Sequence, residues 1–86
     1  MIEIFSTPRF DKNYKKLPKE VKLKAEKKEG FFKINPFDLR LNTHRLHGKD
    51  KTNWAYWVDY KYRIKFIFLN GSKVLYLDVG THDEVY

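Results

Sequence analysis

The sequence predicts an α+β fold, in which an N-terminal strand and a two-helix hairpin pack on one face of a four-stranded antiparallel sheet. Three observations predict this arrangement. Before residue 40, apolar residues recur at the three- and four-residue spacing of a helix face. After residue 40, short runs rich in aromatic and β-branched residues are typical of strands. Asn70-Gly71 separates the last two runs, and both residues tolerate the positive φ of a hairpin turn. The 86 residues suffice for one domain, which we expect to span 1–86.

The N-terminal half is predicted to form a strand and two helices. The apolar run Ile2–Phe5 is typical of a short strand. A helix should follow, with Thr7 as its N-cap and Pro8 at its first position. Its apolar face is formed by residues at spacings of four and three, namely Phe10, Tyr14 and Leu17. A second helix is expected over Pro18–Lys33, because proline ends one helix and can begin the next.

The C-terminal half is predicted to form an antiparallel meander. The expected strands are Leu41–Leu46, Trp54–Tyr60, Tyr62–Leu69 and Lys73–Val79, with a tight turn at Tyr60-Lys61. Two helices can cover only one face of such a sheet, so the other face should be open to a ligand.

Strand alternation indicates which side chains lie on that open face. In Tyr62–Leu69, Arg63 and Lys65 alternate with an apolar set that should meet the helices. In the last strand we expect a core set and an outward set, which are Leu75, Leu77 and Val79 against Val74, Tyr76 and Asp78. If the chain stays extended, His82 follows the outward set and shares a face with Arg63.

Charge indicates the class of partner. The net charge is +7 and the pI is about 9.6, which favours polyanions: nucleic acid first, an acidic protein second and an anionic membrane surface third. No apolar run approaches the roughly 20 residues of a membrane span, and we expect no secretory signal and no membrane partner. The absence of cysteine excludes disulfides and fits a cytoplasmic location. Leu23 lies off the helix stripe, as either an isolated exposed leucine or a partner contact.

The candidate chemistry is acid–base cleavage of RNA. Attack of a 2′-hydroxyl on the adjacent phosphate needs a base, an acid and positive charge. Arg63, His82 and Tyr86 supply suitable side chains near the chain's end, and the basic segment His44–Lys51 could hold a backbone or could simply be a solvated loop. We expect no metal and no cofactor, because the histidines lack ligand spacing: His44 and His47 would point to opposite faces of a strand.

Three short segments carry a family resemblance, and they are His44–Gly48, Tyr62–Phe66 and Val79–Tyr86. In their order and spacing, which together are fairly specific, they resemble the RelE/ParE superfamily of bacterial and archaeal toxins, and more narrowly its RelE-type and YafQ-type mRNA interferases. The resemblance covers essentially the whole chain. It implies a helical hairpin on an antiparallel sheet, cleavage of mRNA in the ribosomal A site without a cofactor, and neutralisation by a cognate acidic antitoxin.

Carried over by position, the resemblance implies roles for four catalytic residues. Arg63 would stabilise charge on the scissile phosphate, and His82 would be the general acid. His44 would assist as a base or phosphate ligand, and Tyr86 would position the nucleotide. The implied substrate-binding residues are Arg45, Lys49, Lys51 and Lys65. The RelE pattern has a second arginine near its end, which this sequence lacks, so histidine is expected to take that role.

Two other readings of the sequence remain. A ParE-like inhibitor of DNA gyrase would have the same fold without RNA cleavage. The tail with His82 and Tyr86 argues against it, since binding to gyrase needs no acid–base set. The third reading is a non-catalytic RNA-binding module.

Overall fold

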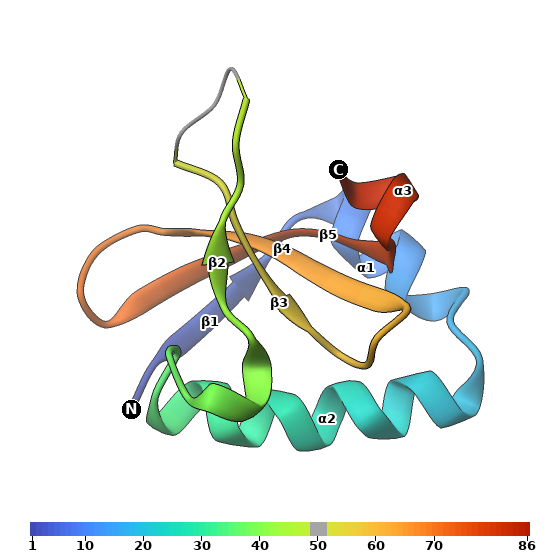
Figure 1. The fold of residues 1–86 in the computed structure, drawn as a ribbon, viewed down its shortest axis with the longest axis horizontal. Helices are drawn as coiled ribbons and strands as arrows, with labels where there is room; N and C mark the ends of the chain where they lie inside the picture. The colour runs from blue at the N-terminus through green and yellow to red at the C-terminus, as the bar shows by residue number, and fades with distance from the viewer. Residues whose placement is uncertain (49–51) are drawn as a thin grey trace.

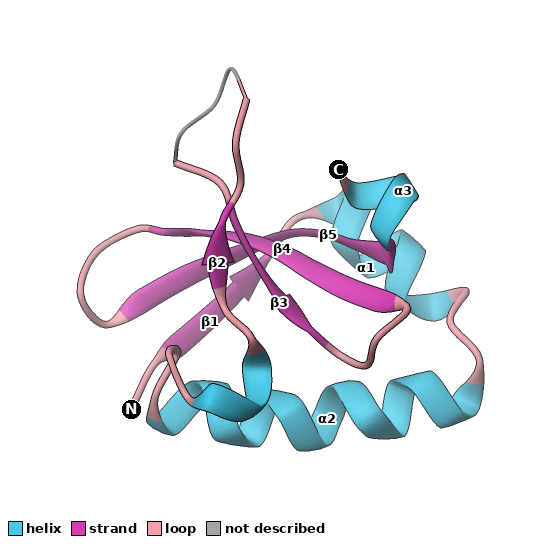
Figure 2. Ribbon diagram, in the orientation of Figure 1, coloured by secondary structure: helices cyan, strands magenta, loops and turns pink. Residues whose placement is uncertain are grey.

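The computed structural model describes residues 1–48 and 52–86, so the predicted substrate-binding residues Lys49 and Lys51 lie outside the described residues. The elements, labelled in Figure 1 and coloured by type in Figure 2, are β1 (Glu3–Ser6), α1 (Pro8–Lys15), α2 (Lys19–Ile34), the 3-10 turn η1 (Leu39–Leu41), β2 (His44–Arg45), β3 (Trp54–Trp57), β4 (Tyr62–Phe68), β5 (Lys73–Thr81) and α3 (His82–Val85). The predicted strand, helical hairpin and meander are confirmed in this order.

The two predicted helices begin where local chemistry places them. Thr7 caps α1, since its hydroxyl accepts a hydrogen bond from the Phe10 N–H at 3.1 Å, and Pro8 occupies the first turn. Pro18 precedes α2, which ends one residue beyond the expected Lys33. Within the described residues, no helix is long and apolar enough to cross a membrane.

The α+β class is confirmed, but the sheet differs from the predicted one. The described strands form a five-stranded sheet in the order β1-β5-β4-β3-β2, and β1 runs parallel to β5 while the other pairs are antiparallel. The pairing runs from Glu3 with Lys73 to Ser6 with Tyr76. Addition of β1 satisfies the backbone groups along the outer edge of β5, which would otherwise be open.

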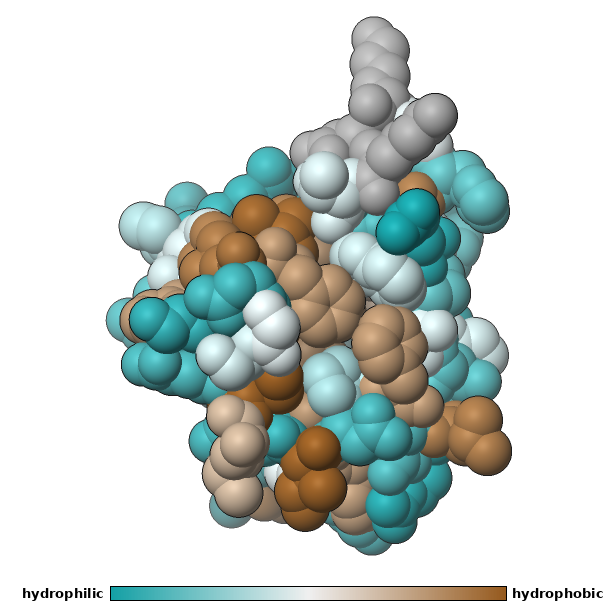
Figure 3. All heavy atoms as spheres, turned by 90° about the vertical axis from the view of Figure 1, so that its left-hand side faces the viewer, coloured by the Kyte–Doolittle hydropathy of each residue, from teal (hydrophilic) through white to brown (hydrophobic). Residues whose placement is uncertain are grey.

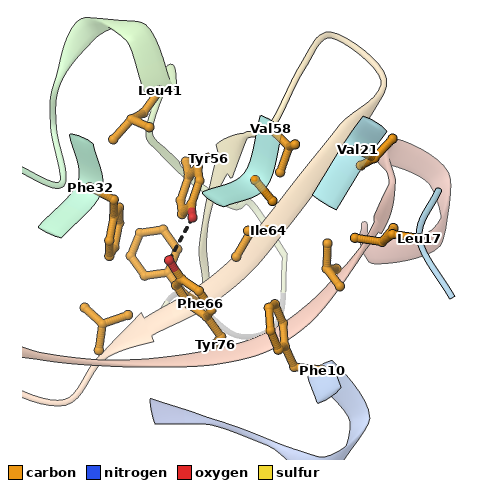
Figure 4. Packing of buried hydrophobic residues seen from close by; sticks show 13 residues of the cluster. Phe10, Leu17, Val21, Phe32, Leu41, Tyr56, Val58, Ile64, Phe66 and Tyr76 are labelled. Atoms are coloured by element: carbon orange, nitrogen blue, oxygen red, sulfur yellow. Dashed lines mark hydrogen bonds between the residues drawn. The ribbon is translucent and has the colours of Figure 1, made fainter. Parts of the chain in front are cut away.

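The core lies between α2 and the sheet, and its four largest fully buried side chains are aromatic (Figure 4). The Phe32 ring, fully buried, packs against Tyr56 and Phe66 at centroid distances of 4.8 and 5.0 Å. The hydroxyls of Tyr56 and Tyr76 hydrogen-bond each other at 2.7 Å inside this core. Because each ring buries on the order of 150–250 Å², a few of them suffice for a chain this small.

A β-bulge overturns the predicted alternation over residues 74–77 of β5, whereas the predicted core position of Val79 is confirmed. Val74 and Tyr76 are buried in the core, whereas the sequence predicted Leu75 and Leu77 there. Lys65 pairs with Asp78 and the next residue, Phe66, pairs with Tyr76, so Leu77 is an extra residue in β5. One extra residue moves every side chain on one side of it to the opposite face. The alternation predicted for β4 is confirmed, because Ile64 and Phe66 are buried.

The strand predicted over Leu41–Leu46 is shorter than expected. Asp38 caps η1 by accepting the Arg40 N–H at 2.9 Å, and this turn includes Leu41. Asn42 follows in the left-handed conformation at φ 51°, which interrupts an extended chain. Strand β2 is therefore limited to two residues.

The strand predicted over Trp54–Tyr60 also ends early, at Trp57. The carboxylate of Asp59 accepts the N–H groups of Lys61 at 2.9 Å and Tyr62 at 2.7 Å. These hydrogen bonds close the connection to β4, because an aspartate can bond backbone groups two residues further on.

Candidate active site

The sheet face opposite α2 carries the predicted site residues in two cross-strand rows. His44 pairs with Ala55, which pairs with Lys65, so the three side chains lie on one face of β2, β3 and β4. Two residues along, Trp57 pairs with Arg63, which pairs with Gly80 of β5. The prediction that Arg63 and Lys65 face away from the helices is consistent with this register.

The C-terminal turn α3 folds back over these rows. The shared face of His82 and Arg63 was expected only if the chain stays extended, and this condition is not met, because β5 ends at Thr81. Thr81 and Glu84 form a capping box, in which the Glu84 carboxylate accepts the Thr81 N–H at 2.7 Å. Gly80 leaves room for that carboxylate, because a Cβ there would lie 3.0 Å from Glu84 Oε1. Val85 is buried, although it lies outside the main core cluster.

Tyr86 is the point at which the site residues meet. Its hydroxyl lies 2.5 Å from Nε2 of His44, and its ring centroid lies 4.2 Å from that of His82. Burial raises the pKa of Tyr86, and the neighbouring Arg63 guanidinium partly opposes that shift. The hydroxyl is therefore protonated at neutral pH. Tyr86 therefore contacts residues of β2, β4 and α3, three elements that are distant from one another in the sequence.

The hydrogen bonds of His44 define its tautomer. Nδ1 lies 2.8 Å from the carbonyl oxygen of Asn42, which can only accept, so Nδ1 carries the proton. In a neutral ring, Nε2 then has a free lone pair and accepts the hydrogen bond of the Tyr86 hydroxyl. This nitrogen is thus presented as a proton acceptor.

Arg63 is held tightly and is only 6% exposed. Its guanidinium carbon lies 4.1 Å above the Trp57 ring, and Nη1 donates to the carbonyl oxygens of Asp59 at 2.7 Å and Tyr62 at 3.2 Å. Nε is buried without a hydrogen-bond partner among the described residues. A buried donor left unpaired costs free energy, which an anion could recover.

His82 is more open to solvent. Its side chain is 57% exposed, and Nδ1 lies 3.2 Å from the carboxylate of Asp83. Its backbone N–H donates to the Lys61 carbonyl at 3.2 Å, which anchors the start of α3 to the turn before β4. The imidazole can therefore meet a solute without any change in the backbone.

Beside Tyr86 the surface is hollowed to a volume of about 370 Å³. Lys65, His47 and Asn53 are among its lining residues. The sequence did not single out Asn53, whose Oδ1 is buried without a hydrogen-bond partner in the described part of the chain. The one sequence signal that could have found Asn53 is its position directly before the predicted strand that begins at Trp54. Arg45 borders the hollow, but its guanidinium lies 5.0 Å from the centroid of the Trp54 ring. Arg45 pairs with Trp54, and the strand register places both side chains on the sheet face opposite that of His44.

Metal ligands do not gather in the described residues. No group of three or more histidine, cysteine, aspartate or glutamate side chains that could hold a metal ion occurs over 1–48 and 52–86.

The order of strands and helices defines the class: the chain has the fold of the RelE-superfamily toxins. The chain is similar to YafQ from E. coli strain BL21(DE3), with a TM-score of 0.80 and 17% identity. The match covers 100% of this chain and 99% of that one. The RelB-RelE antitoxin-toxin complex from Methanococcus jannaschii gives a TM-score of 0.72 and 19% identity over 95% of this chain and 94% of that one. A YoeB/ParE toxin from Agrobacterium tumefaciens gives a TM-score of 0.77 and 14% identity over 94% of this chain and 99% of that one. No family model matches the sequence, and neither does any curated protein.

Proposed function

We propose that this protein is the toxin of a type II toxin-antitoxin system and a metal-independent endoribonuclease that cleaves mRNA on the ribosome. The observation that carries the proposal is the convergence of two histidines and an arginine on Tyr86, beside a hollow lined by Lys65. Cleavage by an internal 2′-hydroxyl requires a base, an acid and positive charge, which the imidazole pair, the guanidinium and the lysine can supply. The toxins that share the fold support the toxin class.

In the proposed reaction, Nε2 of His44 accepts the proton of the 2′-hydroxyl as that oxygen attacks the adjacent phosphorus. The bond from phosphorus to the 5′-oxygen breaks, and His82 donates a proton to the departing oxygen. The products are a 2′,3′-cyclic phosphate and a free 5′-hydroxyl. The lone pair of His44 Nε2, which here accepts the hydrogen bond of the Tyr86 hydroxyl, and the exposure of His82 support this division of roles.

Arg63 is proposed to stabilise the negative charge that grows on the phosphate. Its Nε has no hydrogen-bond partner among the described residues, whereas Nη1 is bonded to backbone carbonyls, and the guanidinium also interacts with the Tyr86 hydroxyl. Because the Tyr86 hydroxyl interacts with both Arg63 and His44, we propose that the Tyr86 side chain moves aside when the phosphate binds. We propose that the displaced ring then stacks on a base next to the cleaved bond.

Two partners complete the proposal. The net charge of +7 suits ribosomal RNA and mRNA, and it suits an acidic antitoxin that would neutralise the toxin. The antitoxins in the complexes that share this fold support the second partner.

The test is expression of the chain in a translating extract, followed by mapping of mRNA 5′ ends. We expect cuts within translated frames that carry 5′-hydroxyls. Intact mRNA together with double-strand DNA breaks would instead assign the protein to the gyrase inhibitors. Binding of RNA without cleavage would make it a non-catalytic RNA-binding module.

A further inference from the structure

A hydrophobic patch lies at one end of the molecule, away from the candidate site. Hydrogen bonds from Ile2 N–H to the Lys33 carbonyl and from Glu3 N–H to the Ser72 carbonyl, at 2.9 and 2.8 Å, bring the N-terminus, the end of α2 and the β4–β5 turn together. Figure 3 shows hydrophobic residues gathered on this side. We call it the end patch and define it by its exposed members, which are Met1, Ile34, Phe37, Leu39 and Leu69.

The end patch has a firm base. Phe37 packs against Trp54 and Phe68 at centroid distances of 5.5 and 5.9 Å, and Trp54 packs edge-on against Phe68 at 5.5 Å. The faces of these rings are therefore partly covered by their neighbours. The most exposed side chains that follow α1 in the patch are aliphatic: Leu39 is 93% exposed and Ile34 is 77% exposed. A nucleic-acid site would present free ring faces for bases, so the end patch suits a protein partner better than RNA.

The charges around the end patch are mostly positive. Lys33, Lys73 and Arg45 adjoin it and have no ion-pair partner within 4.0 Å among the described residues. Of the neighbouring carboxylates, Asp38 is bonded by Arg40, whose hydrogen bonds lower the pKa of Asp38 to about 2. Two copies meeting through this surface would bring like charges together. The charge therefore favours a partner with acidic residues.

We propose that the end patch is the docking surface for an acidic amphipathic helix of another protein. Its members project from the N-terminus, the end of α2, the segment that follows α2 and the β4–β5 turn, so contact must come through side chains and not through an added strand. A helix with apolar anchors at i, i+3, i+4 and i+7 and carboxylates beside them matches an apolar surface with a basic rim. The inference goes beyond the proposed ribonuclease, because no member of the end patch lines the hollow beside Tyr86.

The test uses a defined probe: a synthetic 18-residue helical peptide with leucines at those four positions and glutamates around them. A second peptide replaces every glutamate with lysine. Binding is measured by fluorescence anisotropy at physiological salt and in the absence of RNA, so the result does not depend on cleavage. The variant is Ile34→Glu/Leu39→Glu. The matched control is Leu23→Glu, which changes an exposed leucine elsewhere on α2.

We expect the glutamate peptide to bind the parent protein and the Leu23→Glu control alike, within about twofold, and the double variant at least about tenfold more weakly. The lysine peptide should not bind. Equal weakening by the control and the double variant would overturn the proposal, because attraction would then come from net charge alone. Loss of self-association in the double variant, measured by sedimentation, would overturn it in favour of a second copy. Loss of binding to a single-stranded RNA oligonucleotide would overturn it in favour of RNA.

Discussion

At the scale of single residues, Tyr86 organises the candidate site because its ring contacts both histidines and its hydroxyl interacts with Arg63. Each histidine has a distinct environment: His44 is fixed by the Asn42 carbonyl, whereas His82 is held by its backbone and leaves its ring exposed. Such a difference is what separate roles as base and acid require.

The first prediction concerns His82. The substitution His82→Ala should lower mRNA cleavage by about 10²–10⁴-fold, which is the usual contribution of a general acid. The fold should be retained, because the side chain is mostly exposed. The measurement is the rate at which 5′ ends appear in a translating extract, with circular dichroism as the check on folding. If the variant cleaves as fast as the parent, His82 is not the acid.

The second prediction concerns Trp57, which we regard as a positioning residue for Arg63. In Trp57→Leu the guanidinium loses its stacking partner, and we expect a fall in kcat of about tenfold from a contact of roughly 0.5–2 kcal/mol. KM should change little, and Trp57→Phe should restore most of kcat because it retains a ring. A rise in KM with unchanged kcat would show that Trp57 acts in RNA binding.

At the scale of elements, the position of α3 brings His82 and Tyr86 to the candidate site. It is a single turn, too short to be stable alone, and depends on the capping box between Thr81 and Glu84 and on burial of Val85. Hydrogen bonds from Thr81 lower the pKa of Glu84. The capping box is therefore complete above the ordinary carboxyl pKa of 4.5 and is lost as pH falls through the lowered value.

The third prediction follows from that turn. Glu84→Ala removes the acceptor for the Thr81 N–H, and Gly80→Ala places a Cβ 3.0 Å from Glu84 Oε1, so that the carboxylate must shift slightly. Both should reduce cleavage by a similar factor of about tenfold, while the midpoint of thermal unfolding changes by only a few degrees, since capping affects stability weakly. Glu84→Gln is the matched control, because it keeps an acceptor oxygen. Full activity in Gly80→Ala would contradict this role for the turn.

At the scale of the whole molecule, the core depends on a buried pair of tyrosines. Burial raises the pKa of both Tyr56 and Tyr76, so their hydroxyls stay protonated in the folded state. In the unfolded chain they ionise near 10.0. The folded state therefore holds these protons more tightly, and the stability linked to them is complete below pH 10 and lost as pH rises above it.

The fourth prediction is a steep fall in the free energy of unfolding between pH 9 and pH 11, measured by urea denaturation. Tyr56→Phe/Tyr76→Phe should flatten that fall, because it removes both hydroxyls together and leaves neither unpaired. The matched control is Tyr60→Phe, which removes the hydroxyl of an exposed tyrosine and should leave the fall unchanged. An equally steep fall in the double variant would place its origin elsewhere.

Much of the fold follows from local patterns. The cap at Thr7, the break at Pro18 and the apolar stripe of α2 are local signals, because a helix makes its hydrogen bonds and sets its faces within a few residues. The same holds for Arg63 and Lys65, whose alternation with buried neighbours placed them on the face opposite the helices.

Tertiary structure alone decided three features. The bulge at Leu77 depends on pairing with β4, and one residue of register changes the face of every side chain beyond it. The parallel addition of β1 depends on the free edge of β5. The contact of Tyr86 with His44 joins residues 42 positions apart. The sequence by itself determined which side chains are available for chemistry; only the fold decided that they meet, because α3 turns back over the sheet through contacts that no local pattern encodes.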